Sequence, residues 1–324
     1  MYKVKCPVCG ATHTMKKGKR KGIKLYICSG CGYQFRNSHD VPLEELWNSY
    51  QDGKQTVQEL ANAHGVSPST IKRRLHDVTK EWEQPQLAGS GFVHLDTTYW
   101  GNNWGVLLGL DEESGKPLYV AFVKHEKVQD YKDAVSSIEE RGYTIRGIVI
   151  DGMQQLFEEF ASYKTQMCQF HMKQIIKRHL TQNPKLLAAR ELKAMMENLP
   201  EKQKDEFEEE YKQWKTKWKD TLNRRSLLKS GKRPYTHKRL RTAMHSVDFY
   251  LPHLFTYQLP ECEGMPNTNN KIEGTFTDLK KNLNNHSGMT KENRKRFISG
   301  FFLALESKLE RSGEKPEKEE TGNT

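Results

Sequence analysis

The sequence predicts a multidomain α/β protein in which two small N-terminal modules precede a core of mixed strands and helices. Three observations lead to this prediction. Two Cys-x2-Cys pairs lie within residues 1–38, strand and helix patterns alternate within residues 90–180, and charged helical patterns fill residues 181–258. The chain has 324 residues, of which 35% are hydrophobic and 10% aromatic, so at least one module can bury a sizeable core.

The first module, residues 1–38, is predicted to be a zinc ribbon. Cys6 and Cys9 form one pair and Cys28 and Cys31 the other, with 18 residues between the pairs. Four thiolates complete a closed tetrahedral Zn²⁺ site, so the metal would hold the fold and do no chemistry. A redox role of the pairs is the alternative. The module carries nine Lys or Arg and no Asp or Glu, which favours nucleic-acid contact over a merely solvated face.

Residues 39–82 are predicted to form a helix-turn-helix DNA-binding domain of three short helices. Pro42 can open the first helix, Gly65 makes a turn after the second, and Ser67 caps the third. The third helix would bury Ile71 and Leu75. The residues that it would present to a DNA groove and its phosphates are Ser69, Thr70, Lys72, Arg73 and Arg74. A small helical packing unit without DNA contact is the alternative.

The catalytic core is expected to begin at residue 90. The strand patterns cover residues 92–100, 104–115 and 116–126, a helix 129–142, a strand 145–152, a helix 154–163, and a fifth strand ends near 167–170. This order is typical of a ribonuclease-H-like fold, in which the first and fourth strands are neighbours. We expect residues 90–180 to form the first part of that core and residues 259–311 the second.

Three acidic residues fit one metal site. Asp96 and Asp151 close apolar or β-branched runs and are expected at strand ends, and Glu273 opens a helical stretch. Two Mg²⁺ ions roughly 3.5 to 4 Å apart, or Mn²⁺ in their place, need shared carboxylate oxygens to activate water and stabilise a phosphate leaving group. Each acid also has a structural alternative: a turn hydrogen bond for Asp96, a turn or helix cap for Asp151, and a capping box with Asn270 for Glu273.

The helix that carries Glu273 is amphipathic. Its predicted buried stripe consists of Ile272, Phe276, Leu279 and Leu283. Glu273, Thr277 and Lys280 would lie on an adjoining face, where Lys280 could contact DNA. Residues 181–258 are expected to be an all-helical insertion, in which Trp214 and Trp218 pack or, alternatively, stack on bases. Residues 312–324 are expected to be a disordered tail.

The net charge of +11 predicts a polyanionic partner, since Lys and Arg that neutralise phosphates release counterions on binding. DNA, RNA and an anionic membrane surface would all satisfy this charge. No apolar run reaches the roughly 20 residues that span a bilayer, and the N-terminal residues have no signal-peptide character. We therefore expect a soluble, intracellular protein.

Together these motifs resemble one family, the bacterial insertion-sequence transposases of the IS256 and Mutator-like superfamily, in the variant with an N-terminal zinc-binding module. The resemblance covers most of the chain, and its segments are CPVCG with CSGCG, HLDTTYWG, VIDGM, CQFHMKQ, NTNNKIEGTFTDLKKNLNNHSGM and RFISGFF. It implies a DDE triad of Asp96, Asp151 and Glu273 and a C-x2-H motif of Cys168 and His171. It also implies a helical insertion before the glutamate.

The resemblance implies a DNA transposase that binds double-stranded DNA at terminal inverted repeats and at a target. Asp96 would bridge two Mg²⁺ ions, with Asp151 and Glu273 each completing one coordination sphere. Joining two ends implies a homodimer or larger synaptic oligomer, in a bacterial cytoplasm at the nucleoid. A catalytically inactive DNA-binding regulator and a ribonuclease-H-like nuclease or junction resolvase are the alternatives.

The C-x2-H motif permits zinc ligation by its spacing, but no second pair lies near it in the sequence. We expect His171 to form a hydrogen bond near the scissile phosphate and Cys168 to pack in the core. A core histidine without a catalytic role is the alternative.

Overall fold

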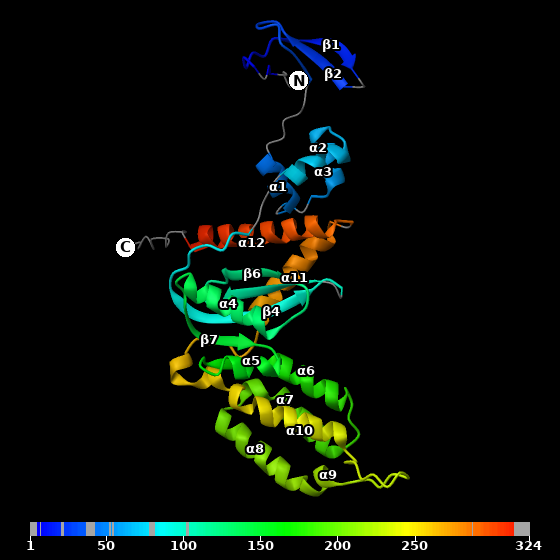
Figure 1. Cartoon of the computed structure of the whole chain (residues 1–324), viewed down its shortest axis with the longest axis vertical. Coiled ribbons are helices and arrows are strands. Elements are labelled where there is room, and N and C mark those ends of the chain that lie inside the picture. Colours follow the sequence, from blue (N-terminus) through cyan, green and yellow to red (C-terminus); the bar gives the residue numbers. More distant parts are fainter. Residues whose placement is uncertain are drawn as a thin grey trace, which may run out of the picture. The chain divides into compact units, whose positions relative to one another are not determined.

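The computed structural model describes residues 5–6, 8–20, 23–36, 43–51, 53, 55–77, 82–101, 104–286 and 288–313. Backbone contacts divide the chain into two compact units (Figure 1). The first comprises Met1–Thr79 with Asn285–Met289, and the second Lys80–Asn284 with Thr290–Thr324. The predicted boundary between residues 38 and 39 and the predicted helix start at Pro42 lie outside the described residues.

The N-terminal part of the first unit is a small antiparallel sheet. Its strands are β1 (Thr14–Arg20), β2 (Ile23–Cys28) and β3 (Gln34–Arg36), in the order β1-β2-β3. Among the described residues of this sheet, the buried members of the apolar cluster are Cys6, Tyr26, Cys28 and Phe35. So small a core supplies little hydrophobic stabilisation, so this sheet needs another source of stability, such as a metal.

Three helices follow in the first unit: α1 (Leu43–Gln51), α2 (Val57–His64) and α3 (Pro68–Asp77). Thr56 and Glu59 form a capping box at the start of α2, and Gly65 ends this helix in the left-handed conformation with φ 62°. The backbone N–H of Thr70 donates to Ser67 Oγ at 3.2 Å, so Ser67 caps α3 as predicted.

The second unit is built on a mixed five-stranded sheet. Its strands are β4 (Ser90–Tyr99), β5 (Gly105–Asp111), β6 (Pro117–Val123), β7 (Thr144–Ile150) and β8 (Thr165–Met167). Their order is β6-β5-β4-β7-β8, with antiparallel pairing among the first three and parallel pairing among the last three. The first and fourth strands of this unit, β4 and β7, are therefore neighbours, as predicted.

Helices cover both faces of this sheet (Figure 1). Leu95 of β4 lies in the main core with Tyr131 and Ile138 of α4 (Val128–Glu140), beside α5 (Gln154–Glu159). Successive strand residues point to opposite faces, so Phe92 and His94 face the other side. There they meet the segment that leads into α11 (Asn270–Asn284), which α12 (Lys291–Gly313) follows.

The inserted segment contains α6 (Gln169–Leu180), α7 (Leu187–Glu197), α8 (Lys204–Lys217), α9 (Lys219–Asn223) and α10 (Lys238–Tyr250). Short 3-10 helices lie at Leu199–Glu201, Leu251–His253, Thr256–Gln258 and Pro260–Cys262. The tryptophans pack rather than project: Trp214 is 3% exposed and its Nε1 donates to Ala188 O at 3.0 Å. Among the described residues, no helix is both long and apolar enough to cross a bilayer.

Two local predictions for this unit are wrong. Residues 224–236 are not helical, because a backbone ladder folds them into a hairpin that Gly231 turns with φ 75°. The C-terminal helix continues to Gly313, so residues 312 and 313 are not part of a disordered tail. The rest of the predicted tail, residues 314–324, lies outside the described residues.

Candidate metal centre at the sheet edge

Asp96 lies inside β4 and not at its end, because the β-branched and aromatic residues Thr97 to Tyr99 continue the strand. Asp96 pairs with Leu108 of β5, whereas the pairing of β4 with β7 stops at His94 and Val149. Extending that register by two residues aligns Asp96 with Asp151. Parallel strands lie about 4.8 Å apart and aligned residues point to the same face, so the register brings these two acids side by side.

The charge around Asp96 supports this placement. Burial raises the pKa of the Asp96 carboxyl well above its usual value, and the negative charges of Asp151, Glu126 and Glu273 raise it further. The backbone N–H of Thr97 donates to Asp96 Oδ1 at 2.8 Å and opposes this shift in part. Four acidic side chains therefore gather at one edge of the sheet. Such crowding is unfavourable without a cation or a proton among them.

Glu126 is the acid that the sequence analysis did not select. It follows β6, which runs in the same direction as β4 and β7, so the ends of all three strands meet at one sheet edge. The hydroxyl of Tyr131 donates to Glu126 Oε1 and lies 3.1 Å from Thr97 Oγ1, next to Asp96. Burial and the charge of Asp151 raise the pKa of Glu126, although the Tyr131 hydrogen bond opposes this. The position of Glu126 just after a strand was the available sequence signal.

Glu273 lies in the first turn of α11, on the side of the site where α6 begins. His171 Nδ1 lies 3.7 Å from Glu273 Oε1, and both atoms are buried without a hydrogen-bond partner. Since Glu273 Oε1 accepts no hydrogen bond, that oxygen does not form the capping box that was the alternative. Cys168 is fully buried, and its Sγ accepts a hydrogen bond from the backbone N–H of Asn269 at 3.3 Å. Burial raises the pKa of the Cys168 thiol to about 11.

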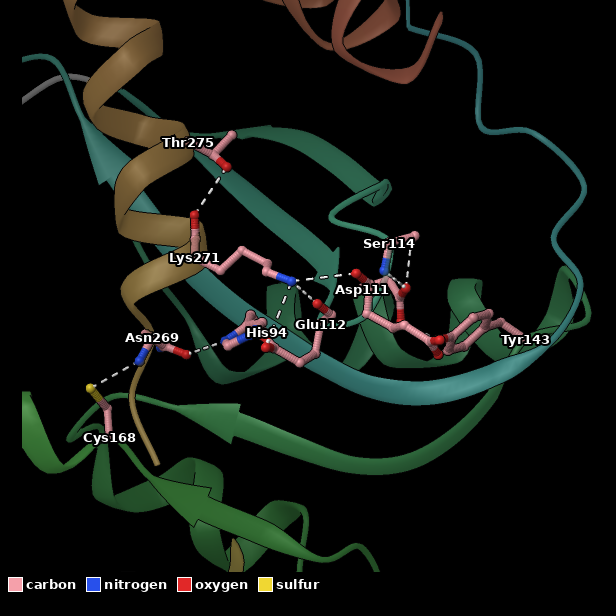
Figure 2. Close-up of polar contacts among 10 residues, drawn as sticks. His94, Asp111, Glu112, Ser114, Tyr143, Cys168, Asn269, Lys271 and Thr275 are labelled. Atoms are coloured by element: carbon pink, nitrogen blue, oxygen red, sulfur yellow. Dashed lines mark hydrogen bonds and ion pairs between the residues drawn. The ribbon is translucent and has the colours of Figure 1, made fainter. Parts of the chain in front are cut away.

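A buried polar network, which was not predicted from the sequence, joins these elements (Figure 2). The ring of His94, which is 0% exposed, contacts Glu112 Oε2 through Nε2 and Asn269 Oδ1 at 2.7 Å through Nδ1. Lys271 Nζ, from the first turn of α11, donates to the backbone carbonyl of Glu112. The network thus ties the strand of Asp96 to the helix of Glu273 and, through Asn269, to Cys168. No local pattern reveals it, because His94 and Asn269 are far apart in the sequence.

Neighbouring contacts anchor the turn after β5 (Figure 2). The hydroxyl of Tyr143 donates to Asp111 Oδ1, and the backbone N–H of Ser114 donates to Asp111 Oδ2 at 2.8 Å. Glu112 follows Asp111 directly, so this anchoring also holds the carboxylate that contacts His94.

The described residues contain two groups whose ligand atoms all lie within 4.8 Å of one another: the four N-terminal cysteines, and Cys168 with His171 and Glu273. Asp96, Asp151 and Glu273 do not form such a single-ion group. A pair of ions roughly 3.5 to 4 Å apart spreads its outer ligands more widely than one ion does. The carboxylate oxygens of the four-acid edge are the hard donors that Mg²⁺ prefers, and this donor set fits that metal.

The four cysteines of the first unit could bind a metal such as zinc. Cys6 Sγ lies 3.6 Å from Cys31 Sγ, and Cys9 Sγ lies 3.5 Å from Cys28 Sγ. Four sulfurs around Zn²⁺ at about 2.3 Å stand roughly 3.8 Å apart, close to these separations. The hydrogen bond from the backbone N–H of Cys31 lowers the pKa of the Cys28 thiol, although burial opposes this shift, and a lower pKa favours the thiolate that a metal binds.

The predicted DNA-contacting residues of α3 lie mostly on its outer side. Ile71 and Leu75 are buried, whereas Ser69, Lys72 and Arg73 are exposed, and Thr70 and Arg74 are partly exposed. On α11 the predicted stripe of Ile272, Phe276, Leu279 and Leu283 is buried, and Lys280 is exposed.

No protein-family model matches this chain, and no curated protein matches it. Among solved structures, a chain of the simian T-cell lymphotropic virus intasome in complex with PP2A regulatory subunit B56 gamma, determined by cryo-electron microscopy, is similar in part. The match has 14% sequence identity and a TM-score of 0.21, and it covers 39% of this chain and 55% of that chain. A likeness of this strength carries no argument about function.

Proposed function

We propose that the protein is a DDE-type DNA transposase of an insertion sequence, with a ribonuclease-H-like core that cleaves and joins DNA strands. The observation that carries the proposal is the gathering of Asp96, Asp151, Glu273 and Glu126 at one sheet edge. The strand order β6-β5-β4-β7-β8, with β4 parallel to β7, is the order expected of such a core.

Asp96, Asp151 and Glu273 would hold two Mg²⁺ ions, with Mn²⁺ as a substitute. When bound, such ions lower the pKa of water and stabilise negative charge on a phosphodiester. Burial and the neighbouring acids raise the pKa of Asp96, so a bound cation would compete with a proton for this carboxyl group. His171 lies next to Glu273 and is partly exposed, so it can donate a hydrogen bond to a phosphate oxygen.

The reaction sequence is hydrolysis followed by transesterification. Water attacks the phosphorus at an element end and the 3′-oxygen leaves, which gives a 5′-phosphate and a free 3′-hydroxyl. That hydroxyl then attacks a second phosphodiester, so one ester bond forms as another breaks. The Cys6, Cys9, Cys28 and Cys31 cluster, as a Zn²⁺ site, and helices α1 to α3 would bind the terminal inverted repeats. Two ends must meet, so we propose a homodimer or larger synaptic oligomer that acts in the bacterial cytoplasm at the nucleoid.

The test is nicking of a linear duplex that carries the inverted repeat flanking the reading frame. Wild type should nick it only with Mg²⁺ or Mn²⁺, and Asp96→Asn should bind it equally well without nicking. Binding without cleavage under any divalent cation would instead leave a DNA-binding regulator. A preference for RNA:DNA hybrids or four-way junctions over element ends would indicate a nuclease or resolvase.

A further inference from the structure

The hairpin of residues 224–236 carries a dense positive charge that nothing in the described structure neutralises. The segment from Thr221 to Val247 contains eight Lys or Arg and no Asp or Glu. Within the described residues, no carboxylate forms an ion pair with Arg224, Lys229, Lys232, Arg233, Lys238 or Arg239. By contrast, Lys204 and Lys212 of α8 pair with Glu208 and Glu209. The charge is therefore available to an external anion.

The hairpin is an ordered arm that projects from the ends of α9 and α10 (Figure 1). Backbone N–H groups of Ser226 and Leu228 donate to Pro234 O and Lys232 O, both at 3.0 Å, and Thr236 N donates to Arg224 O at 2.8 Å. The turn closes with Gly231 N donating to Leu228 O at 2.9 Å. Gly231, with φ 75°, adopts the positive φ that tight hairpin turns favour.

Aromatic contacts hold the base of the hairpin. The guanidinium carbons of Arg225 and Arg241 lie 4.0 Å and 3.7 Å from the centroid of the Tyr235 ring. Arg225 Nη1 also donates to Arg233 O at 2.9 Å, and Arg241 Nη1 to Leu222 O at 3.0 Å. These two arginines stabilise the arm, which leaves the other basic side chains free for binding.

Two leucines at the tip face water. Leu227 is 68% exposed and Leu228 is 48% exposed. Adjacent exposed leucines on a basic hairpin are unfavourable in a free protein and match a partner that offers both phosphates and apolar surface. The grooves of duplex DNA offer both, because they admit a two-stranded ribbon and apolar side chains contact bases within them.

The basic surface includes the end of α6. Arg239 Nη2 donates to Arg178 O at 2.8 Å, which joins the start of α10 to the end of α6. Burial lowers the pKa of His179, and the positive charges of Arg178 and Arg239 lower it further, so the local potential is positive. His171 lies about two turns earlier on the same helix, roughly 10 Å along its axis.

We propose that the hairpin of residues 224–236, with the end of α6, is a binding site for the duplex DNA that the acidic edge would cleave. Lys229, Lys232 and Arg233 contact phosphates, and Leu227 and Leu228 enter a groove. The inference rests on the proposed function for its partner, and it adds a DNA contact separate from the zinc ribbon and the helix-turn-helix.

The test measures duplex binding by fluorescence anisotropy at several salt concentrations, in Ca²⁺ and in the Asp96→Asn background, so that no cleavage occurs. Lys229→Glu with Lys232→Glu should weaken binding at least about tenfold and lower the slope of log affinity against log salt by about 2. The matched control is Lys204→Glu with Lys212→Glu on α8, which should change neither quantity appreciably. Leu227→Ser with Leu228→Ser should weaken binding without changing the slope.

A second measurement does not depend on the variants. Duplex DNA should protect wild-type protein from trypsin at Lys229, Lys232 and Arg233, with the fragments identified by mass spectrometry. The inference would be overturned if the Lys229 and Lys232 variant kept its affinity and salt slope and if DNA gave no protection from trypsin. The hairpin would then bind no DNA, and its charge would be left for another partner such as an acidic protein. If the protein cleaves element ends but gives those negative results, only the hairpin inference is wrong. If DNA protects the hairpin but the protein cleaves no DNA, only the proposed chemistry is wrong.

Discussion

Asp96 is the buried acid whose titration the neighbouring acids affect most directly. Its carboxyl group lies among three other acids at the sheet edge, and its pKa is raised by burial first and by those charges second. The folded protein therefore holds the Asp96 proton more tightly than the unfolded chain does. A cation would relieve the repulsion among the four acids as a proton does, so a proton and a metal ion would compete for the Asp96 carboxylate.

The pH dependence of stability follows from this shift. Without added divalent cations, the contribution of Asp96 is fully present below its usual pKa near 3.8 and is lost as pH rises toward the raised value. Asp96→Asn cannot titrate, so it should become more stable than wild type as pH rises to neutral. Thermal unfolding of both proteins from pH 4 to pH 8 measures this difference. A stability difference that stays constant across this range would contradict the shift.

His94 is a positioning residue, because it contacts Glu112 and Asn269 and reaches no acid of the site directly. His94→Ala would leave buried polar groups unpaired, which costs about 1–3 kcal/mol of stability. It should also raise the Mg²⁺ concentration for half-maximal nicking by roughly 10- to 100-fold, as loss of an outer hydrogen bond does at metal sites.

The control for His94 is Thr216→Ala, which removes an exposed hydrogen bond from Thr216 Oγ1 to Lys212 O within α8. It should leave the Mg²⁺ requirement unchanged. Equal Mg²⁺ titration curves for wild type and His94→Ala, measured well below the unfolding temperature, would show that the network serves stability alone.

At the scale of elements, the N-terminal sheet combines a small apolar core with four cysteines that could bind a metal. The buried apolar cluster and the candidate metal site share two residues, Cys6 and Cys28. The second unit is different, since its sheet carries a core that extends through α4 and the inserted helices. The two parts should therefore respond separately to loss of a metal ligand.

Cys28→Ser tests that separation. It should abolish zinc binding, unfold the N-terminal sheet and weaken binding of element ends, while Mg²⁺-dependent nicking of nonspecific DNA remains at least partly intact. Zinc content per chain and nicking are measured on the same preparation. Cys262→Ala, a buried cysteine outside the cluster, is the control and should keep its zinc. Parallel loss of both activities in Cys28→Ser would mean that the parts do not function separately.

Helix α3 gives a second prediction at this scale. Arg73 is exposed on the helix that follows the Gly65 turn, in a position to contact a phosphate. Arg73→Ala should weaken duplex binding and lower the salt slope by about 1. Gln58→Ala, an exposed change on α2, should alter neither quantity. An unchanged slope in Arg73→Ala would exclude Arg73 from the DNA contact.

For the whole molecule, the proposed strand transfer requires two element ends in one complex. We expect at least two chains per assembled pair of ends, measured by sedimentation of the protein with end-bearing duplex in Ca²⁺. If complexes that contain one chain at every protein concentration still carry out strand transfer, the prediction of a synaptic oligomer is wrong.

The sequence by itself determined the features that depend on local spacing. The four cysteines, the strand and helix order from residue 90 and the caps at Gly65 and Ser67 all follow from residues a few positions apart. The hairpin at residues 224–236 was not predicted from local spacing. Its leucines fit the buried stripe of a helix, but backbone hydrogen bonds between its two arms form a hairpin instead.

The tertiary structure alone decided which groups meet at the site. Glu126 joins Asp96 because three strands end at one sheet edge, and His94 meets Asn269 because α11 returns to β4 after the whole insertion. Contacts between residues so distant in sequence leave no periodic pattern, since their partners are chosen by strand order and packing. That is why the acids at Asp96, Asp151 and Glu273 could be proposed from the sequence, whereas the network that holds them could not.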